Sequence, residues 1–269
     1  MKVGICISLE KAPLAVEAGF DYVELSVSEI ATRDPWDTTP YEGLPIEACN
    51  LFFPGHFRMF DHALRSLIIP YFDIAKPRLH ELGVQVAVIG SGNQRRCPDN
   101  ILFPFESSAL VDTWAGADSP EEVFARYMTF FDYATQYRTP IPAPESLERS
   151  ETNVGTDCAT FSRVLAKHKI GYTADAFHIL HEWDANGREG GLDTPSKEFW
   201  ADQLPHKPTH LHLAQLEGRR FPQPNDSMLE GFFARLRELG YDDRVSLECR
   251  DFEPADYKQA IANLKTYFA

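Results

Sequence analysis

The sequence predicts a single (β/α)8 barrel that spans residues 1–269, and three observations support this fold class. The chain of 269 residues has the length of one barrel of this type. Short apolar runs alternate with longer amphipathic stretches from one end to the other, which is typical of βα units and a parallel sheet. Eight such runs can be counted, which favours a closed barrel over an open sheet.

Each predicted strand is a short, mainly apolar run. The runs lie at residues 2–8, 22–27, 46–53, 84–90, 139–147, 171–177, 209–215 and 245–250. Between them, amphipathic helices are predicted where apolar residues recur at three- and four-residue spacing. The clearest of these segments are 124–137, 156–171 and 227–240. A helix start is predicted at 118–123, where "DSPEEV" supplies an N-cap residue, an early proline and two acids.

The segment 91–117 is too long for an ordinary connection between a strand and a helix. We therefore expect a lid or an insertion over the barrel mouth within the single domain. The stretches 28–45 and 91–117 are the loops in which we expect substrate specificity to lie, because barrel loops vary while the scaffold is kept.

Charge and composition exclude several classes of protein. The chain has 26 Lys and Arg against 40 Asp and Glu, a formal net charge of −14. This balance disfavours nucleic acid and anionic membrane surfaces as partners. No run approaches the roughly 18 to 20 apolar residues that cross a bilayer, and no secretory signal is recognised. The five cysteines are odd in number and form no C-x-x-C pair, so we expect reduced thiols and a cytoplasmic protein.

The last four predicted strands carry ionisable groups near their carboxyl ends. These groups are Glu145, Asp175, His178, His210, His212 and Glu248. Because the active site of a closed parallel barrel forms at those ends, we expect the side chains to converge. Acids are rarely buried without a partner, so their repetition predicts a divalent cation. Carboxylates and an imidazole suit Mn²⁺, Mg²⁺ or Co²⁺, with positions left open for substrate oxygens.

These motifs resemble those of the xylose isomerase-like TIM barrels of the sugar phosphate isomerase/epimerase group. The resemblance covers nearly the whole chain. It is carried by "ACNLFFPGHF" (48–57), "IGSGNQRRCPDN" (89–100), "ESLERSETN" (145–153), "DAFH" (175–178), "HLHL" (210–213) and "LECR" (247–250). Individually the motifs are weak, whereas their order and spacing together are specific.

The resemblance implies a role for each matching residue. Glu145, Asp175, His212 and Glu248 would bind one metal ion, with Mn²⁺ preferred over Mg²⁺, Co²⁺ or Zn²⁺. Glu151, His178 and an arginine after the seventh strand, Arg219 or Arg220, would hold substrate hydroxyls. Glu145 and Glu248 would also move the proton, one on each face of the substrate. The implied activity is isomerisation or epimerisation of a sugar, sugar phosphate or small hydroxy-keto compound through a metal-stabilised enediolate.

Three other functions stay open at this stage. A metal-dependent sugar dehydratase would begin with the same proton abstraction. A phosphodiesterase resembling the abasic-site endonucleases would need a three-zinc cluster with further histidines, and early in the chain we count only His56 and His62 as candidates. A sugar-binding barrel without turnover would need a broken ligand set. We also expect a homodimer to be compatible with an acidic barrel of this size.

The roles of other polar and aromatic residues are left as alternatives. Arg95 and Arg96 either bind an anionic group of the substrate or are solvated loop arginines. Glu24 either faces the cavity or pairs with an arginine of a neighbouring strand, and we favour the structural role. His181 lies one helical turn beyond His178 and is expected to take no part. Phe53 and Trp114 are candidates for an apolar wall beside a sugar ring.

Overall fold

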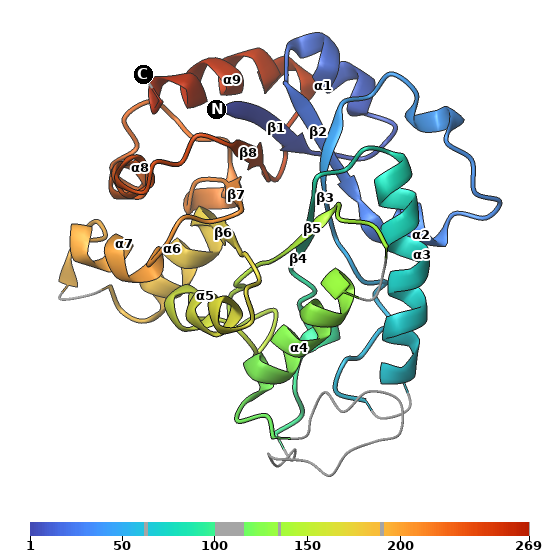
Figure 1. Cartoon of the computed structure of the whole chain (residues 1–269). Coiled ribbons are helices and arrows are strands. Elements are labelled where there is room, and N and C mark those ends of the chain that lie inside the picture. Colours follow the sequence, from blue (N-terminus) through green and yellow to red (C-terminus); the bar gives the residue numbers. More distant parts are fainter. Residues whose placement is uncertain (62–63, 100–115, 134–135, 189–190, 269) are drawn as a thin grey trace.

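The computed structural model describes residues 1–61, 64–99, 116–133, 136–188 and 191–268, and these form a barrel of eight parallel strands (Figure 1). The strands are β1 (Lys2–Cys6), β2 (Tyr22–Ser26), β3 (Ile46–Asn50), β4 (Val86–Ile89), β5 (Ile141–Pro144), β6 (Thr173–Asp175), β7 (His210–Leu213) and β8 (Arg244–Leu247). Their hydrogen-bonded order is β5-β4-β3-β2-β1-β8-β7-β6. A parallel bridge between Glu145 and Thr173 joins the two outer strands of this order. The predicted (β/α)8 barrel is confirmed.

All eight predicted strands are present, and each ends earlier than its apolar run suggests. For β2 and β6 the reason is that the strand passes directly into a helix. Ser26, the last residue of β2, accepts a hydrogen bond from the Glu29 amide and begins α2 (Val27–Thr32). Asp175, the last residue of β6, accepts one from the Phe177 amide and begins α6 (Ala176–Ala185). Such side-chain caps satisfy amides that the first turn of a helix leaves unpaired.

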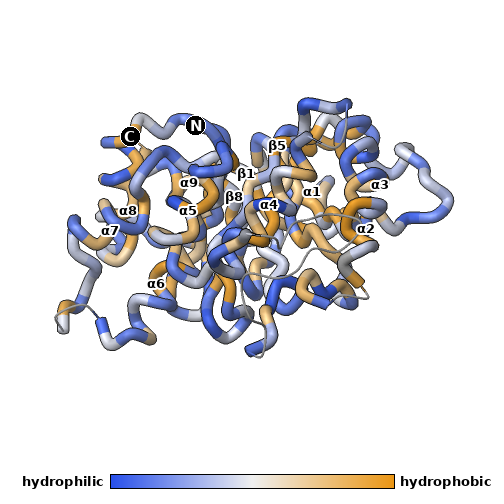
Figure 2. Tube along the Cα trace, turned by 60° about the horizontal axis from the view of Figure 1, so that its bottom comes forward, coloured by the Kyte–Doolittle hydropathy of each residue, from blue (hydrophilic) through white to orange (hydrophobic). Residues whose placement is uncertain are grey.

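The helices surround the barrel. In addition to α2 and α6 they are α1 (Ala12–Ala18), α3 (Ile68–Glu81), α4 (Pro120–Tyr133), α5 (Cys158–Lys167), α7 (Lys197–Gln203), α8 (Ser227–Glu238) and α9 (Tyr257–Thr266). The last helix, α9, packs beside α1, so both ends of the chain meet on one side (Figure 1). Apolar residues are concentrated in the strands and on the helices packed against them, and the connecting loops are largely hydrophilic (Figure 2).

The structure corrects the prediction that residues 28–45 form a specificity loop. Residues 27–32 are helical, and residues 33–45 connect α2 to the first residue of β3. In a (β/α)8 barrel, connections from a helix to the next strand lie at the end opposite the mouth. The prediction failed because the sequence does not reveal that α2 follows β2 without a loop.

The predicted lid at 91–117 falls mostly outside the described residues, which include 91–99 and 116–117 of it. Asn93–Arg95 form a short 3-10 helix directly after β4. Across the described part of the chain, none of the helices has both the length and the apolar character that crossing a bilayer requires.

Candidate active site and metal centre

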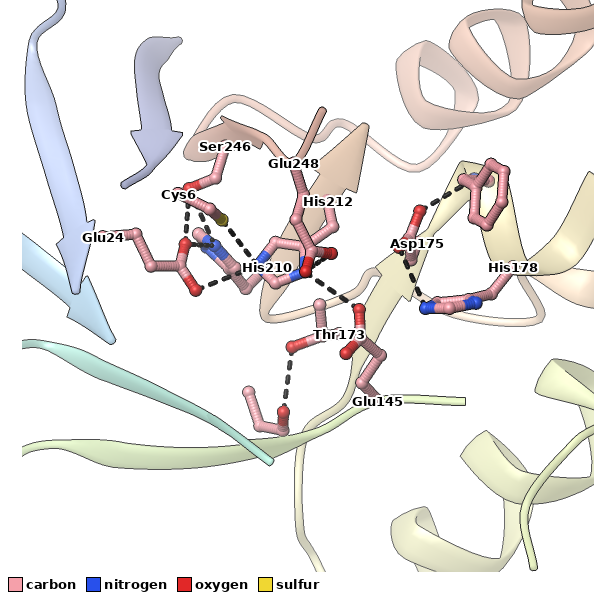
Figure 3. Close-up of polar contacts among 12 residues, drawn as sticks. Cys6, Glu24, Glu145, Thr173, Asp175, His178, His210, His212, Ser246 and Glu248 are labelled. Atoms are coloured by element: carbon pink, nitrogen blue, oxygen red, sulfur yellow. Dashed lines mark hydrogen bonds and ion pairs between the residues drawn. The ribbon is translucent and has the colours of Figure 1, made fainter. Parts of the chain in front are cut away.

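Three carboxylates meet at the carboxyl ends of the strands. Glu145 follows β5, Asp175 ends β6 and Glu248 follows β8 (Figure 3). One ligand atom from each of them, together with one from His178, can be chosen so that all lie within 4.8 Å of one another. A cation with metal–ligand distances of about 2.1 Å requires ligand atoms roughly this close, so small side-chain adjustments would enclose an ion.

Asp175 lies at the junction of β6 and α6, where it caps the helix and its side chain is held in place. Its Oδ1 atom accepts the Phe177 amide at 2.7 Å, which fixes the carboxylate. Its Oδ2 atom is buried and accepts no hydrogen bond in the described structure. Arg219 and His178 each place a nitrogen 3.5 Å from this oxygen without donating a hydrogen bond to it. The oxygen can therefore still accept a cation, and the donor set of three carboxylates and an imidazole fits a divalent ion.

His212 lies beneath the carboxylates, fully buried within β7. Its Nδ1 atom lies 2.9 Å from Oε1 of Glu145 and 3.2 Å from Oε2 of Glu248. Its Nε2 atom lies 2.9 Å from Oε1 of Glu24 on the other side of the ring. The imidazole thus bridges the carboxylate pair at the mouth and a fourth acid inside the barrel (Figure 3).

His178 and Arg219 complete the charged lining. His178, on the first turn of α6, places Nε2 3.5 Å from Oδ2 of Asp175. Arg219 places Nη2 2.6 Å from Oε2 of Glu248 and 3.5 Å from Oδ2 of Asp175. Its guanidinium lies 4.7 Å from the centre of the Phe177 ring. Arg220 is exposed, so the structure brings Arg219 rather than its neighbour to the site.

These groups line a cavity of about 220 Å³ at the barrel mouth. Its lining residues are Asn50, Leu51, Phe53, Gly90, Ser91, Gly92, Gln94, Glu145, Leu147, Glu151, His178, Arg219 and Glu248. The cavity therefore brings together Glu151, His178 and Arg219, which the sequence had singled out as substrate-binding. His212 and Asp175 lie deeper, outside this lining.

Sequence reasoning missed three polar residues of the cavity, Asn50, Ser91 and Gln94. Asn50 could have been found, because it is a polar residue late in a predicted strand. Ser91 lies between two glycines directly after β4, and its buried hydroxyl has no hydrogen-bond partner in the described structure. Nothing in the sequence indicates that Gln94 lines the cavity.

The pKa values of the two glutamates, Glu145 and Glu248, are shifted in opposite directions. Burial raises the pKa of Glu145, and the carboxylates of Glu248 and Asp175 act in the same direction. Burial would also raise the pKa of Glu248, but His212 and Arg219 lower it to about 2. Burial opposes the protonation of His178, yet Asp175 and Glu148 raise its pKa to about 9. Two carboxylates whose pKa values are pushed apart can serve as an acid and a base.

Other expectations are settled by the structure. Glu24 is buried inside the barrel, where a structural role was favoured. Its hydrogen-bond partners are two histidines and a serine, and not an arginine. Arg95 is neither solvated nor aimed at the cavity, because its buried guanidinium donates to the carbonyls of Glu145 and Gly155. His181 lies on α6 with its side chain 43% exposed and contacts Glu148, away from the carboxylates. Phe53 lines the cavity, and Trp114 lies outside the described residues.

Comparison with known proteins identifies the family. Residues 12–267 match the model of the xylose isomerase-like TIM barrel family. The chain belongs to this family. No curated protein sequence matches it significantly.

Solved structures with the same fold include two sugar epimerases and an endonuclease. The 3-keto-D-glucoside 4-epimerase YcjR from E. coli has a TM-score of 0.69 and 18% identity, and the match covers 99% of each chain. The D-psicose 3-epimerase from Clostridium cellulolyticum has a TM-score of 0.65 and 16% identity, over 98% of this chain and 90% of the other. Endonuclease IV from Thermus thermophilus has a TM-score of 0.59 and 13% identity, over 100% and 99%. These similarities establish the fold.

Proposed function

We propose that this chain is a divalent-metal-dependent epimerase or isomerase of an uncharged keto sugar. The observation that carries the proposal is the close approach of Glu145, Asp175 and Glu248, two of which line the cavity, together with Oδ2 of Asp175, which accepts no hydrogen bond in the described structure. The similarity of the fold to two sugar epimerases is compatible with an epimerase or isomerase activity. Fold alone does not decide function, so the argument rests on the site.

The proposed ligands are Glu145, Asp175, His212 and Glu248. Either His178 or His212 is close enough to supply the imidazole. We assign it to His212 because this ring is fully buried and its Nδ1 faces two of the carboxylates. His178 borders the cavity, which suits contact with substrate. When bound, a divalent ion would polarise the carbonyl and hydroxyl oxygens of the substrate.

Glu145 and Glu248 are proposed to move the proton. Glu248, whose carboxylate faces His212 and Arg219, would take a proton from the carbon beside the carbonyl. A protonated Glu145 would then deliver its proton to the resulting enediolate. Delivery to the opposite face of the same carbon inverts it, and delivery to the neighbouring carbon isomerises the sugar. The reverse reaction exchanges the two roles.

Glu151, His178 and Arg219 are proposed to hold hydroxyl groups of the substrate. The cavity provides little that would bind a phosphate. Among its lining residues, Arg219 is the one arginine or lysine, and it is paired with Glu248 and Asp175. Residues 100–115, which follow the cavity loop in the sequence, contain no lysine, arginine or histidine. An uncharged keto sugar fits these surroundings better than its phosphate.

The test begins with metal content, measured by plasma mass spectrometry on protein purified without chelator and reloaded with Mn²⁺. About one ion per chain is expected, with weaker binding in Asp175→Asn. Free ketoses, keto-glucosides and their phosphates are then screened in heavy water for deuterium uptake at carbon, and product analysis distinguishes epimerisation, isomerisation and loss of water.

Glu145→Gln and Glu248→Gln should abolish turnover while the fold survives. Glu253→Gln, which removes an exposed carboxylate from the same loop as Glu248, serves as the control. Turnover that persists in both glutamine variants contradicts the proton-transfer assignment. About three zinc ions per chain would point instead to phosphodiester hydrolysis.

A further inference from the structure

A further acid, Glu24 on β2, lies inside the barrel beneath the proposed metal centre. Its side chain is fully buried. Its Oε1 atom lies 2.9 Å from Nε2 of His212. Its Oε2 atom lies 2.9 Å from Nε2 of His210 and accepts the Ser246 hydroxyl at 2.5 Å (Figure 3). Both oxygens are therefore occupied by donors, in contrast to Oδ2 of Asp175.

This arrangement determines how the His212 ring is oriented. An ionised carboxylate can only accept hydrogen bonds, so the Nε2 atom that faces Glu24 carries the proton. The other nitrogen, Nδ1, then faces Glu145 and Glu248 and can present its lone pair to a cation between them. Histidine ligands of metals commonly donate their second N–H to a carboxylate in this way, which fixes the ring and raises its basicity.

Several residues of the barrel support Glu24 itself. The Tyr22 hydroxyl lies 2.8 Å from Oγ of Ser246 and can donate to it, because the Ser246 proton is used on Glu24. The Tyr22 ring occupies the space beside Gly4, where a Cβ atom would lie 2.2 Å from the ring. Gly4 thus makes room for the Tyr22 ring, and Tyr22 orients Ser246, which donates to the carboxylate.

Cys6, Glu24 and His212 could in principle hold an ion of their own, since one ligand atom from each lies within 4.8 Å of the others. Both oxygens of Glu24 already accept hydrogen bonds. The Cys6 sulfur lies 3.8 Å from Nε2 of His212, the nitrogen that faces Glu24. An ion here would have to displace these donors, so the cluster is better suited to support a ligand than to bind a metal.

We propose that Glu24 is a positioning residue that holds His212 with Nδ1 directed at the metal between Glu145 and Glu248. This inference rests on the proposed function, in which His212 is a ligand. It assigns a role in metal affinity to a residue that contacts neither substrate nor ion.

The test compares Mn²⁺ affinity in the full-length parent, Glu24→Gln and Cys6→Ala by isothermal titration calorimetry, without substrate. Loss of such a supporting carboxylate typically weakens metal binding by about 10- to 100-fold, and we expect a loss in this range for Glu24→Gln. Cys6→Ala removes another group beside the same His212 nitrogen and should leave affinity unchanged. The visible spectrum of the Co²⁺-loaded protein should change in Glu24→Gln alone, since it reports the ligand geometry.

Ser246→Ala keeps Glu24 but removes one of its donors, and a smaller loss of affinity is expected if Glu24→Gln folds poorly. Thermal unfolding of the metal-free variants shows whether the fold is retained. Equal Mn²⁺ affinity in parent, Glu24→Gln and Ser246→Ala would overturn the inference, as would loss of a second bound ion in Cys6→Ala. A parent that binds no metal would instead refute the proposed function.

Discussion

Replacing Arg95 by methionine removes the donor that holds two backbone carbonyls beneath the barrel mouth. The buried guanidinium donates to the Glu145 carbonyl at 2.6 Å and to the Gly155 carbonyl at 3.3 Å. It also lies between two aromatic rings, 5.3 Å from the centre of Phe124 and 5.1 Å from that of Phe161. Methionine retains much of the side-chain volume but none of these donors.

The expected loss follows from these contacts. A hydrogen bond from a charged donor contributes about 1.5–3 kcal/mol, and cation–π contacts add about 1 kcal/mol in total. Because the bond to Gly155 is long, we count mainly the bond to Glu145 and expect Arg95→Met to lower the free energy of unfolding by about 3 kcal/mol. For a chain of this size, that corresponds to a fall in melting temperature of about 6–12 °C.

Urea unfolding at equilibrium, with thermal unfolding as a second measure, provides the assay. The matched control is Arg96→Met in the next position. Its side chain is exposed, and among the described residues its contacts are long ones of 3.5 and 3.4 Å to the Arg149 and Ser150 carbonyls. We expect this control to lie within about 0.5 kcal/mol of the parent. An Arg95→Met protein within about 1 kcal/mol of the parent would refute the reasoning, and so would equal losses in both variants.

Two further predictions concern the site. Gly90→Ala should weaken Mn²⁺ binding, because the added Cβ would lie 2.8 Å from Oε2 of Glu145. Gly55→Ala should not, because no atom of the described residues lies within 4 Å of its added Cβ. In metal-free protein, the pKa of His178 is raised from 6.5 to about 9, so its stabilising contribution is complete below pH 6.5 and is lost as the pH rises through about 9. The difference in unfolding free energy between the parent and His178→Gln should therefore shrink over that interval, and a difference independent of pH contradicts the assignment.

The number of strands and the convergence of acidic side chains at one end of the barrel could be predicted because both follow from local patterns. Eight apolar runs predict eight strands, and a polar residue late in such a run predicts a group at the barrel mouth. Ligand atoms of Glu145, Asp175 and Glu248 do lie within 4.8 Å of one another at this end of the barrel. The choice between Arg219 and Arg220 could not be made, because it depends on the turn after β7, where Arg219 has a φ of 52°. A pattern of residue types does not specify such a backbone conformation.

The environment of Glu24 illustrates a second limit. Its partners His210, His212 and Ser246 come from β7 and β8, which lie on the far side of β1 in the hydrogen-bonded order. The sequence shows that Glu24 lies in an apolar run, but not which side chains of distant strands meet it. Only the register of the closed barrel brings the two histidines to its carboxylate. For the same reason, an arginine partner was a reasonable but incorrect expectation.

Epimerases and an endonuclease share this fold, so the fold does not distinguish their reactions. The number of side chains that could bind metal ions is a more useful criterion. Among the residues that the structure describes, two groups could hold a cation, and they are adjacent. The group around Glu24 has its carboxylate oxygens occupied by hydrogen-bond donors, whereas Asp175 in the other keeps a buried oxygen without one. The described side chains thus favour one ion over a cluster of three. One ion bound by Glu145 and Glu248, as proposed, would suit proton transfer beside a carbonyl group, which is the reaction expected of a keto sugar.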